Sequence, residues 1–285
     1  MEILYKDSEK PQNVALVLGF FDGLHLGHLS VIKNVPANTP VVVVTFSESP
    51  SEYFGKNIKY IYSRQKNYEL LNQHGISFIY EQDFSKIANL SAEEYLSYLI
   101  KEFSPISITS GFNHTFGAKR VGNPDFLRKN EVSYKYFYTE PTIIDNEIVS
   151  STKIKSLIEN AELKKAKDFL SRNFSITSSV VEGEKLGRQL GFPTANMKYP
   201  KGIVKLPYGV YKVKVLGHNA VMNWGIKPTF QSEEVIEVHI PNFEDDLYGK
   251  TLEVEIISKI RDEQKFEDLI GLKTQIKKDV EECLK

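Results

Sequence analysis

Two histidines stand three residues apart in the stretch GFFDGLHLGH, directly after the apolar run VALVL. If a helix begins there, His25 and His28 project from one face, and the free N–H groups of its first turn attract an anion. Two imidazoles at that point could donate hydrogen bonds to phosphate oxygens as charge builds up in a transition state. A zinc site would need further ligands, which neither a nearby cysteine nor an H-E-x-x-H pattern supplies. Phosphate binding and a purely structural histidine pair both stay open on this pattern alone.

The same stretch resembles the H-x-G-H signature of nucleotidylyltransferases, which transfer a nucleoside monophosphate from ATP and release pyrophosphate. The resemblance implies that His25 and His28 are catalytic. It also implies that the preceding turn lies at the nucleotide phosphates; the turn residues concerned are Gly19, Phe20, Asp22 and Gly23.

Such enzymes carry a second signature, a helix start rich in serine and threonine and followed by a cation, and VSSTKIK fits it. If Ser150 caps that helix, Ser151 and Lys155 are four residues apart and share a face. Ser151 and Thr152 could then donate hydrogen bonds to phosphate oxygens while Lys155 supplies positive charge. Alone, the pattern is also typical of an ordinary capped helix with exposed lysines. The histidine motif upstream favours the phosphate interpretation.

The second half contains another candidate site in EKLGRQLGFPTANM. Gly187 and Gly191 permit close approaches and backbone conformations that other residues rarely adopt. Thr194 and Asn196 follow a proline and offer hard oxygen donors suited to Mg²⁺. Read without context, this could equally be a glycine-rich loop without chemistry.

The strand pattern VIEVHI singles out one glutamate. Alternation places Ile236, Val238 and Ile240 on one face and Glu237 on the other. Because an unpaired glutamate in a core is costly, Glu237 should face solvent or a ligand pocket.

Together with PYGVYKVKV, NWGIKPTF, IEVHIPNFEDDLYGK and IRDEQKFEDLIGLKTQIKKD, these stretches closely resemble the riboflavin kinase domain. Nearly the whole chain resembles the prokaryotic bifunctional riboflavin kinase/FAD synthetase family, in which an adenylyltransferase domain precedes a kinase domain. The resemblance implies that riboflavin and ATP give FMN, and that FMN and a second ATP give FAD and pyrophosphate. Mg²⁺ is expected in both steps, where it neutralises charge on phosphate oxygens.

The resemblance also implies roles for single residues. Thr194 and Asn196 would hold Mg²⁺ and the nucleotide phosphates, and Glu237 would be the base for the ribityl hydroxyl. Further phosphate contacts are expected from Gly187, Arg188 and Gly191. Arg261 would contact the flavin or close the kinase site, although a surface arginine beside two acids is an equally simple interpretation. Asn113, in GFNHTFG, matches a position that the family uses around ATP and FMN.

Three departures from the family pattern concern the adenylyltransferase half. Phe20 stands where the family usually has asparagine, and TFSESP replaces the usual Thr-Phe-x-Pro-His-Pro. Lys155 replaces an arginine, which keeps the charge but loses the planar fork. These departures leave the predicted fold intact and bear on the rate or substrate preference of adenylylation.

The elements that must position these residues change character along the chain. In the first half, apolar runs such as VVVVTF alternate with helical patterns, which predicts a parallel α/β sheet. The resemblance implies that this sheet is of the Rossmann-like nucleotidylyltransferase type. The segment SSTKIKSLIENAELKKAKDFLSRNF is predicted to be helical and solvent-facing. Period-two alternation after it predicts an antiparallel sandwich or barrel, of which the resemblance implies the β-barrel, and then a C-terminal helix. The predicted domains are 1–171 for FMN adenylylation and 172–285 for riboflavin phosphorylation.

Composition narrows the function classes. With 36 basic and 37 acidic residues, the chain has no basic excess for nucleic acid or an anionic membrane. The single cysteine, Cys283, excludes an intramolecular disulfide and is typical of a reducing compartment. Since no signal-peptide core or membrane-length apolar run is apparent, we expect a cytoplasmic protein. Its expected partners are riboflavin, FMN, FAD and ATP/ADP, and the sequence does not predict an oligomeric state.

Three other functions compete with the bifunctional enzyme. One is a riboflavin kinase whose first domain is degenerate, although the retained polar residues of both N-terminal motifs argue against decay. Another is a dinucleotide-dependent oxidoreductase, but GFFDGLHLG is not G-x-G-x-x-G. The last is a non-catalytic regulator that binds flavin or nucleic acid, of which the balanced charge disfavours the second.

Overall fold

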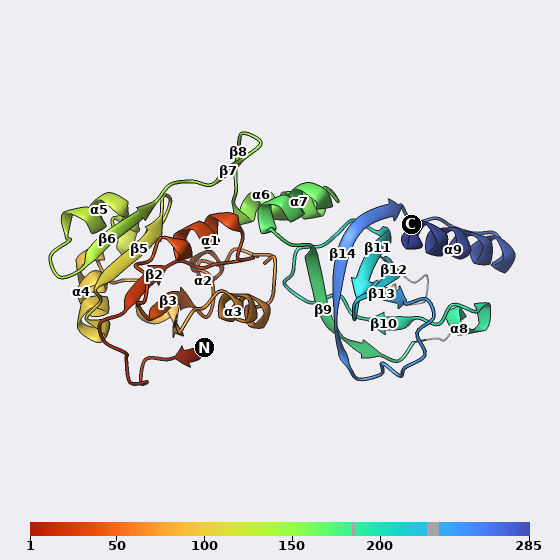
Figure 1. Cartoon of the computed structure of the whole chain (residues 1–285), viewed down its shortest axis with the longest axis horizontal. Coiled ribbons are helices and arrows are strands. Elements are labelled where there is room, and N and C mark those ends of the chain that lie inside the picture. The colour runs from red at the N-terminus through yellow and green to blue at the C-terminus, as the bar shows by residue number, and fades with distance from the viewer. Residues whose placement is uncertain (184–185, 227–233) are drawn as a thin grey trace. The chain divides into compact units, whose positions relative to one another are not determined.

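The computed structural model describes residues 1–183, 186–226 and 234–285. It divides into two compact units, Met1–Ser151 and Thr152–Lys285, and each contains its own sheet (Figure 1). Two of the motifs quoted above extend outside the described residues, at 184–185 and at 227–230.

The first unit is built on a parallel sheet with the strand order β1-β4-β3-β2-β5-β6 (Figure 1). The strands are β1 Glu2–Leu4, β2 Ala15–Leu18, β3 Val41–Phe46, β4 Phe78–Gln82, β5 Ser107–Gly111 and β6 Lys135–Thr139. Val42 and Val43 of β3 point to opposite faces and are both 0% exposed, which confirms the predicted parallel α/β sheet. The strand order reverses at β2, because β3 lies on one side of it and β5 on the other. In such sheets ligands bind at the carboxyl ends of the strands that flank the reversal.

Helices and turns connect the strands. They are α1 Leu26–Lys33, α2 Pro50–Tyr53, α3 Arg64–Gln73, α4 Ala92–Phe103, α5 Pro124–Lys129, the 3₁₀ turns Phe84–Lys86 and Ala118–Arg120, and the hairpin of β7 Ile143–Ile144 and β8 Glu147–Ile148. Helix α4 begins with the capping box that the spacing of Ser91 and Glu94 predicts. Ser91 Oγ accepts from the Glu94 N–H at 3.1 Å, and Glu94 Oε2 accepts from the Ser91 N–H at 2.8 Å.

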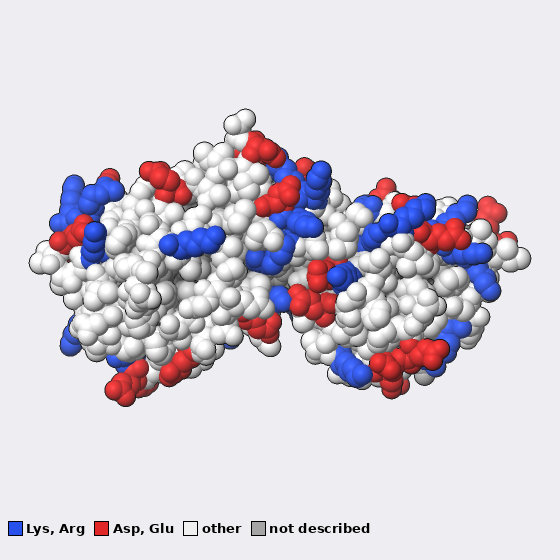
Figure 2. All heavy atoms as spheres, in the orientation of Figure 1, with Lys and Arg blue, Asp and Glu red and all other residues white. Residues whose placement is uncertain are grey.

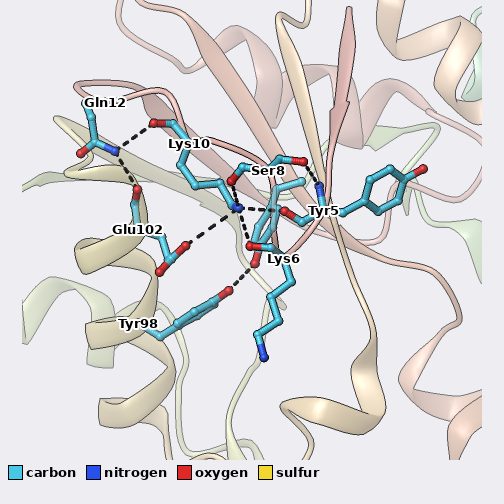
Figure 3. Close-up of polar contacts among 8 residues, drawn as sticks. Tyr5, Lys6, Ser8, Lys10, Gln12, Tyr98 and Glu102 are labelled. Carbon is cyan, nitrogen blue, oxygen red and sulfur yellow. Dashed lines mark hydrogen bonds and ion pairs between the residues drawn. The ribbon is translucent and has the colours of Figure 1, made fainter.

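Lys10 anchors the segment that follows β1 (Figure 3). Its ammonium donates hydrogen bonds to the backbone carbonyls of Tyr5 at 2.7 Å, Lys6 at 2.8 Å and Ser8 at 2.6 Å. Glu102 on α4 lies 3.9 Å away, and the Lys10 side chain is only 5% exposed. The buried charge is therefore satisfied by the loop that it organises.

Lys10→Ala is expected to lower the free energy of unfolding of the first unit by about 1–3 kcal/mol, because charge-assisted hydrogen bonds to three carbonyls are lost. Urea unfolding followed by circular dichroism measures the change. Lys6→Ala is the matched control, since the exposed Lys6 side chain can be removed while its carbonyl stays. An equal loss in both variants would contradict the anchoring role.

The helical segment after the first sheet consists of α6 Ser151–Glu159 and α7 Leu163–Leu170. The prediction that this segment faces solvent was wrong for one face of each helix, because apolar residues at helical spacing gather there. The buried residues are Ile154, Leu157 and Ile158 on α6, and Leu163, Ala166, Phe169 and Leu170 on α7. Helix α7 packs against the first and last strands of the barrel that follows.

The second unit contains a closed antiparallel barrel with the order β10-β13-β12-β11-β14-β9, which confirms the predicted β-barrel (Figure 1). The strands are β9 Phe174–Val181, β10 Ala195–Met197, β11 Gly209–Val215, β12 His218–Ile226, β13 Glu234–His239 and β14 Thr251–Arg261. Ile236 and Val238 are 0% and 1% exposed, which confirms the predicted core face of β13. Helix α8 Leu186–Leu190 precedes β10, and the C-terminal helix α9 Leu269–Leu284 packs on β11 and β12.

The surface carries charges of both signs. Figure 2 shows basic and acidic side chains interspersed on the face drawn, in keeping with a formal net charge of −1. Among the described residues, none of the helices has the length and apolar character needed to cross a membrane.

Candidate active sites

The histidine motif lies where the sheet order reverses. The chain leaves β2 at Leu18, turns, and enters α1 with His25 as the N-cap residue. On the neighbouring strand β5, Ser110 is the register partner of Leu18, and Asn113 follows shortly after. The predicted residues that follow the carboxyl ends of these two strands are Gly19, Phe20, Asp22, Gly23, His25, His28 and Asn113.

The two histidine rings stack on each other, with centroids 3.6 Å apart and planes inclined by 18°. Phe21 presents its ring to His28 at 5.1 Å. His25 Nδ1 accepts a hydrogen bond from the backbone N–H of His28 at 3.3 Å. Because Nδ1 is the acceptor, the neutral His25 ring carries its hydrogen on Nε2, which can donate to a phosphate oxygen. His25 is 5% exposed and His28 is half-buried.

Hydrogen bonds from distant parts of the chain fix the turn before α1. Asp22 Oδ1 accepts from the Ile61 N–H at 2.8 Å, and the Gly23 N–H donates to Asn67 Oδ1 at 2.9 Å. Ser151 Oγ donates to the Asp22 carbonyl at 2.8 Å. The structure thus brings the start of the second predicted motif to the first one.

The departures from the family pattern have local structural roles. Phe20 stacks on Tyr60 with ring centroids 5.6 Å apart. In TFSESP, Ser49 caps α2, and its Oγ accepts from the Glu52 N–H at 3.1 Å. Thr152 and Lys155 continue α6 within the second unit, where Thr152 is exposed and Lys155 is half-buried.

The first unit also contains an aromatic cavity of about 280 Å³. The residues that line it come from β3, α2, α4 and the loops after β4 and β5. The aromatic ones are Phe46, Phe54, Phe84, Tyr95 and Phe116. Lys119 and Arg120 add two positive charges to the same cavity. A planar apolar ring system with an anionic tail suits such walls. Sequence reasoning missed these residues, because an aromatic content of 12% does not say which rings face a cavity.

Asn113 is exposed at the start of the loop that leads into this cavity. Its neighbour His114 has a buried Nε2 atom without a hydrogen-bond partner among the described residues. Burial lowers the pKa of His114 to about 4, so its ring is neutral at physiological pH and adds no charge to the site.

In the barrel, four predicted residues meet in one cavity of about 470 Å³. Its lining includes Gly187, Thr194, Glu237 and Arg261. Glu237 on β13 lies between two asparagines, since its register partners are Asn196 on β10 and Asn223 on β12. Directly paired residues of neighbouring strands share a face, so the three polar side chains stand in one row.

A second cavity of about 470 Å³ adjoins the first at Thr194, which lines both. Arg188 and the acidic and aromatic loop 243–248 form other parts of its wall. Gly191 follows α8 with a φ of +91° and is not among the described residues that line either cavity. Thr194 therefore stands where ligands of the two cavities would meet.

Gly183 lies directly against the side chain of Asn196. A Cβ built at position 183 would lie 2.4 Å from Asn196 Cγ, well under the 3.0 Å that real Cβ atoms keep. Asn196 is only 6% exposed and has little room to move. The glycine therefore sets the position of the asparagine.

Gly183→Ala is expected to lower riboflavin phosphorylation about 10- to 100-fold. The added methyl group would displace the Asn196 side chain, and catalysis depends on the exact position of such groups. FMN adenylylation by the same chain should not change. Gly217→Ala in the β11–β12 turn is the control: unlike Gly183, Gly217 has a positive φ of +84°, so its alanine adds backbone strain, but nothing lies within 4 Å of the added Cβ to be displaced. Kinase assays of both variants, with matched thermal unfolding, separate site displacement from loss of fold.

Arg261 is held by an acid that sequence reasoning did not single out. Its Nε donates to Asp279 Oδ1 at 3.1 Å, and one terminal nitrogen donates to Asp279 Oδ2 at 2.8 Å. The other terminal nitrogen donates to the Asp262 carbonyl at 3.0 Å, and Phe266 lies beneath the guanidinium at 5.9 Å. Asp279 lies on α9, eighteen residues further along the chain. Arg261 therefore lines the cavity and links β14 to α9 through its ion pair with Asp279. It is not the simple surface arginine that the sequence also allowed.

Two family models match the chain, one for each half. The FAD synthetase model matches residues 7–153, and the riboflavin kinase model matches residues 170–285. Each match covers one of the candidate sites described above.

Relatives match over both halves at once. Bifunctional riboflavin kinase/FMN adenylyltransferase from Haemophilus influenzae is 34% identical over 288 residues, which cover 95% of this chain and 93% of the relative. The protein of the same name from Escherichia coli K12 is 32% identical, with 95% and 92% covered. A crystal structure described as a macrolide-efflux protein from Streptococcus pneumoniae has a TM-score of 0.89 and 31% identity, with 98% and 97% covered. The chain therefore belongs to the bifunctional riboflavin kinase/FMN adenylyltransferase family.

Proposed function

We propose that the two reactions of this enzyme, riboflavin to FMN and FMN to FAD, take place at two separate sites. The histidine loop of the first unit carries adenylyl transfer, and the barrel cavity carries phosphoryl transfer. The observation that supports this division most directly is the meeting of Thr194, Glu237 and Arg261 in one barrel cavity. The histidine pair lies in the other compact unit.

In adenylyl transfer, a phosphate oxygen of FMN attacks the α-phosphorus of ATP, and pyrophosphate leaves. His25 and His28 donate hydrogen bonds to the phosphate oxygens as negative charge develops, and the N-terminus of α1 adds its dipole. Gly19, Phe20, Asp22 and Gly23 form the turn around the phosphates. Ser151 holds this turn through its hydrogen bond to the Asp22 carbonyl, while Thr152 and Lys155, further along α6, are proposed to supply a hydroxyl donor and positive charge.

The aromatic cavity of the first unit is the proposed place of the FMN ring system during adenylylation. Phe54, which is 69% exposed, offers ring surface for stacking, and Lys119 and Arg120 favour the anionic phosphate. Asn113 stands at the start of the loop that supplies one wall, which suits a contact to ATP or FMN.

In phosphoryl transfer, the terminal ribityl hydroxyl oxygen attacks the γ-phosphorus of ATP. Glu237 takes the hydroxyl proton, and ADP leaves. Riboflavin would occupy the cavity lined by Glu237 and Arg261, and ATP the adjoining cavity with Arg188. Thr194 lines both cavities. It therefore lies where the phosphoryl group would pass from ATP to riboflavin. Gly187 and Gly191 shape the loop around α8 that borders these cavities.

Thr194 and Asn196 offer donors that fit Mg²⁺, and of the two only Thr194 is among the described residues that line the cavities. The Thr194 hydroxyl and the Asn196 amide oxygen are hard, neutral oxygens, and no group of three or more His, Cys, Asp or Glu residues in the described parts of the chain is placed to hold a metal. Mg²⁺ commonly takes few protein ligands and completes its shell with phosphates and water. When bound, the ion would neutralise charge on the phosphate oxygens.

The proposed functional domains are residues 1–171 and 172–285. The family models leave residues 154–169 between them, and these comprise most of α6 and α7 and the three residues that join the two helices. The use of ATP in both reactions supports a cytoplasmic location.

Separate sites can be tested by competition. The initial rate of FAD formation from FMN is measured by chromatography with Mg²⁺ and ATP, with and without a large excess of riboflavin. An unchanged rate is expected. A rate that falls in proportion to riboflavin occupancy would mean one shared flavin site, and no FAD at all would mean that the first site is inactive.

A further inference from the structure

The barrel cavity carries an excess of negative charge. Among the described residues that line it, three carboxylates, Glu237, Glu263 and Asp279, stand against the single guanidinium of Arg261. Riboflavin is neutral, whereas the phosphate of FMN carries a charge of about −1.5 to −2 at neutral pH. Substrate and product of the kinase reaction share the same ring system, so charge is the main property by which the cavity can tell them apart.

Asp279 cancels the positive charge of Arg261, because it is 3% exposed and engages Arg261 through both carboxylate oxygens. Gln275 Nε2 donates a further hydrogen bond to Asp279 Oδ1 at 2.8 Å. If the guanidinium turned towards a phosphate, it would leave a buried carboxylate without its ion pair, which is strongly unfavourable. The charge of Arg261 is therefore neutralised by Asp279, and its guanidinium lines the cavity without being available to bind an anion.

We propose that Asp279 is a specificity-determining residue that makes the kinase cavity favour riboflavin over FMN, and so promotes release of the product. The inference rests on the proposed placement of riboflavin in this cavity. It predicts a gain of binding: when the Asp279 charge is removed, Arg261 becomes a free cation and FMN binds more tightly.

The quantity to measure is the inhibition constant of FMN divided by the riboflavin KM. Initial rates are followed with isotopically labelled riboflavin, and labelled FMN and FAD are counted together, so that adenylylation does not affect the result. Asp279→Asn keeps the shape of the side chain but changes the net charge of the Arg261–Asp279 pair from zero to +1. Because a positive charge attracts the FMN dianion, the ratio should fall about tenfold. In Arg261→Met it should rise, and in the double variant it should return towards the wild-type value.

Asp262→Asn is the matched control, because the Asp262 side chain is 86% exposed and lies outside the lining of the cavity. Its ratio should stay within about twofold of wild type, since solvent and salt screen an exposed charge. The double variant keeps the test valid if Arg261→Met fails to fold, because it removes both charges together.

An unchanged ratio in Asp279→Asn, or a parallel rise of both constants, would overturn the inference, since a merely structural role weakens both flavins alike. If riboflavin is phosphorylated but FMN does not compete with it even in Asp279→Asn, the placement of the flavin fails as well. If FMN competes and the ratio does not move, only the role of Asp279 fails.

Discussion

His28→Ala is expected to reduce FAD formation from FMN about 100- to 1000-fold, the usual cost of removing one preorganised donor to a developing oxyanion. His28 is the more exposed ring of the stacked pair, while His25 is buried and caps α1. Removing the His28 side chain leaves its backbone N–H, so the hydrogen bond to His25 Nδ1 can persist. The loss should therefore appear in kcat with little change in stability. Separate rate measurements with riboflavin and with FMN check it.

His74→Ala is the control for this experiment. His74 is an exposed C-cap residue of α3 in the same unit, and its replacement should leave both activities unchanged. Loss of riboflavin phosphorylation in a folded His28→Ala protein would argue against separate sites.

Glu237→Gln is expected to slow riboflavin phosphorylation about 100- to 10,000-fold, because the amide cannot accept the hydroxyl proton. The change keeps the size of the side chain and its place in the row with Asn196 and Asn223. FMN supplied directly should still be adenylylated at the wild-type rate. The same chromatographic assay measures both activities.

Glu234→Gln is the control on the same strand. Glu234 pairs with Lys205 and is not part of the described lining of the kinase cavity, so its replacement should affect neither reaction. Normal phosphorylation by Glu237→Gln would remove this residue from the role of base and leave positioning alone to account for catalysis.

Local patterns were sufficient to predict most of the fold. Uninterrupted β-branched residues predicted β3 as a covered parallel strand, and alternation predicted β11, β13 and β14. Strands of three residues, such as β1 and β10, are too short to show a period, so only pairing with their neighbours defines them. The burial of one face of α6 and of α7 was not predicted, because the many lysines of this segment indicated a solvent-exposed helix and the apolar residues at helical spacing were given too little weight.

The candidate sites were predictable where a motif keeps its residues close in sequence. His25 with His28 and Thr194 with Asn196 are of this kind. Ile61 and Asn67 hold the first motif in place from distant positions, and nothing in their local sequence distinguishes them from ordinary core or surface residues. Asp279 ends a stretch that carries the resemblance, but its pairing with Arg261 is a tertiary contact. Such partners follow from tertiary packing and could not be read from one sequence.

The hydrogen bond from Ser151 to Asp22 joins residues separated by 129 positions, and it has a consequence for biosynthesis. During translation the parallel sheet can assemble while the chain is still emerging, but the turn before α1 lacks this contact until residue 151 has left the ribosome. Contacts of such long range form late in folding. A fragment that stops at residue 150 would keep every strand of the first sheet and still lack the bond that closes its catalytic turn.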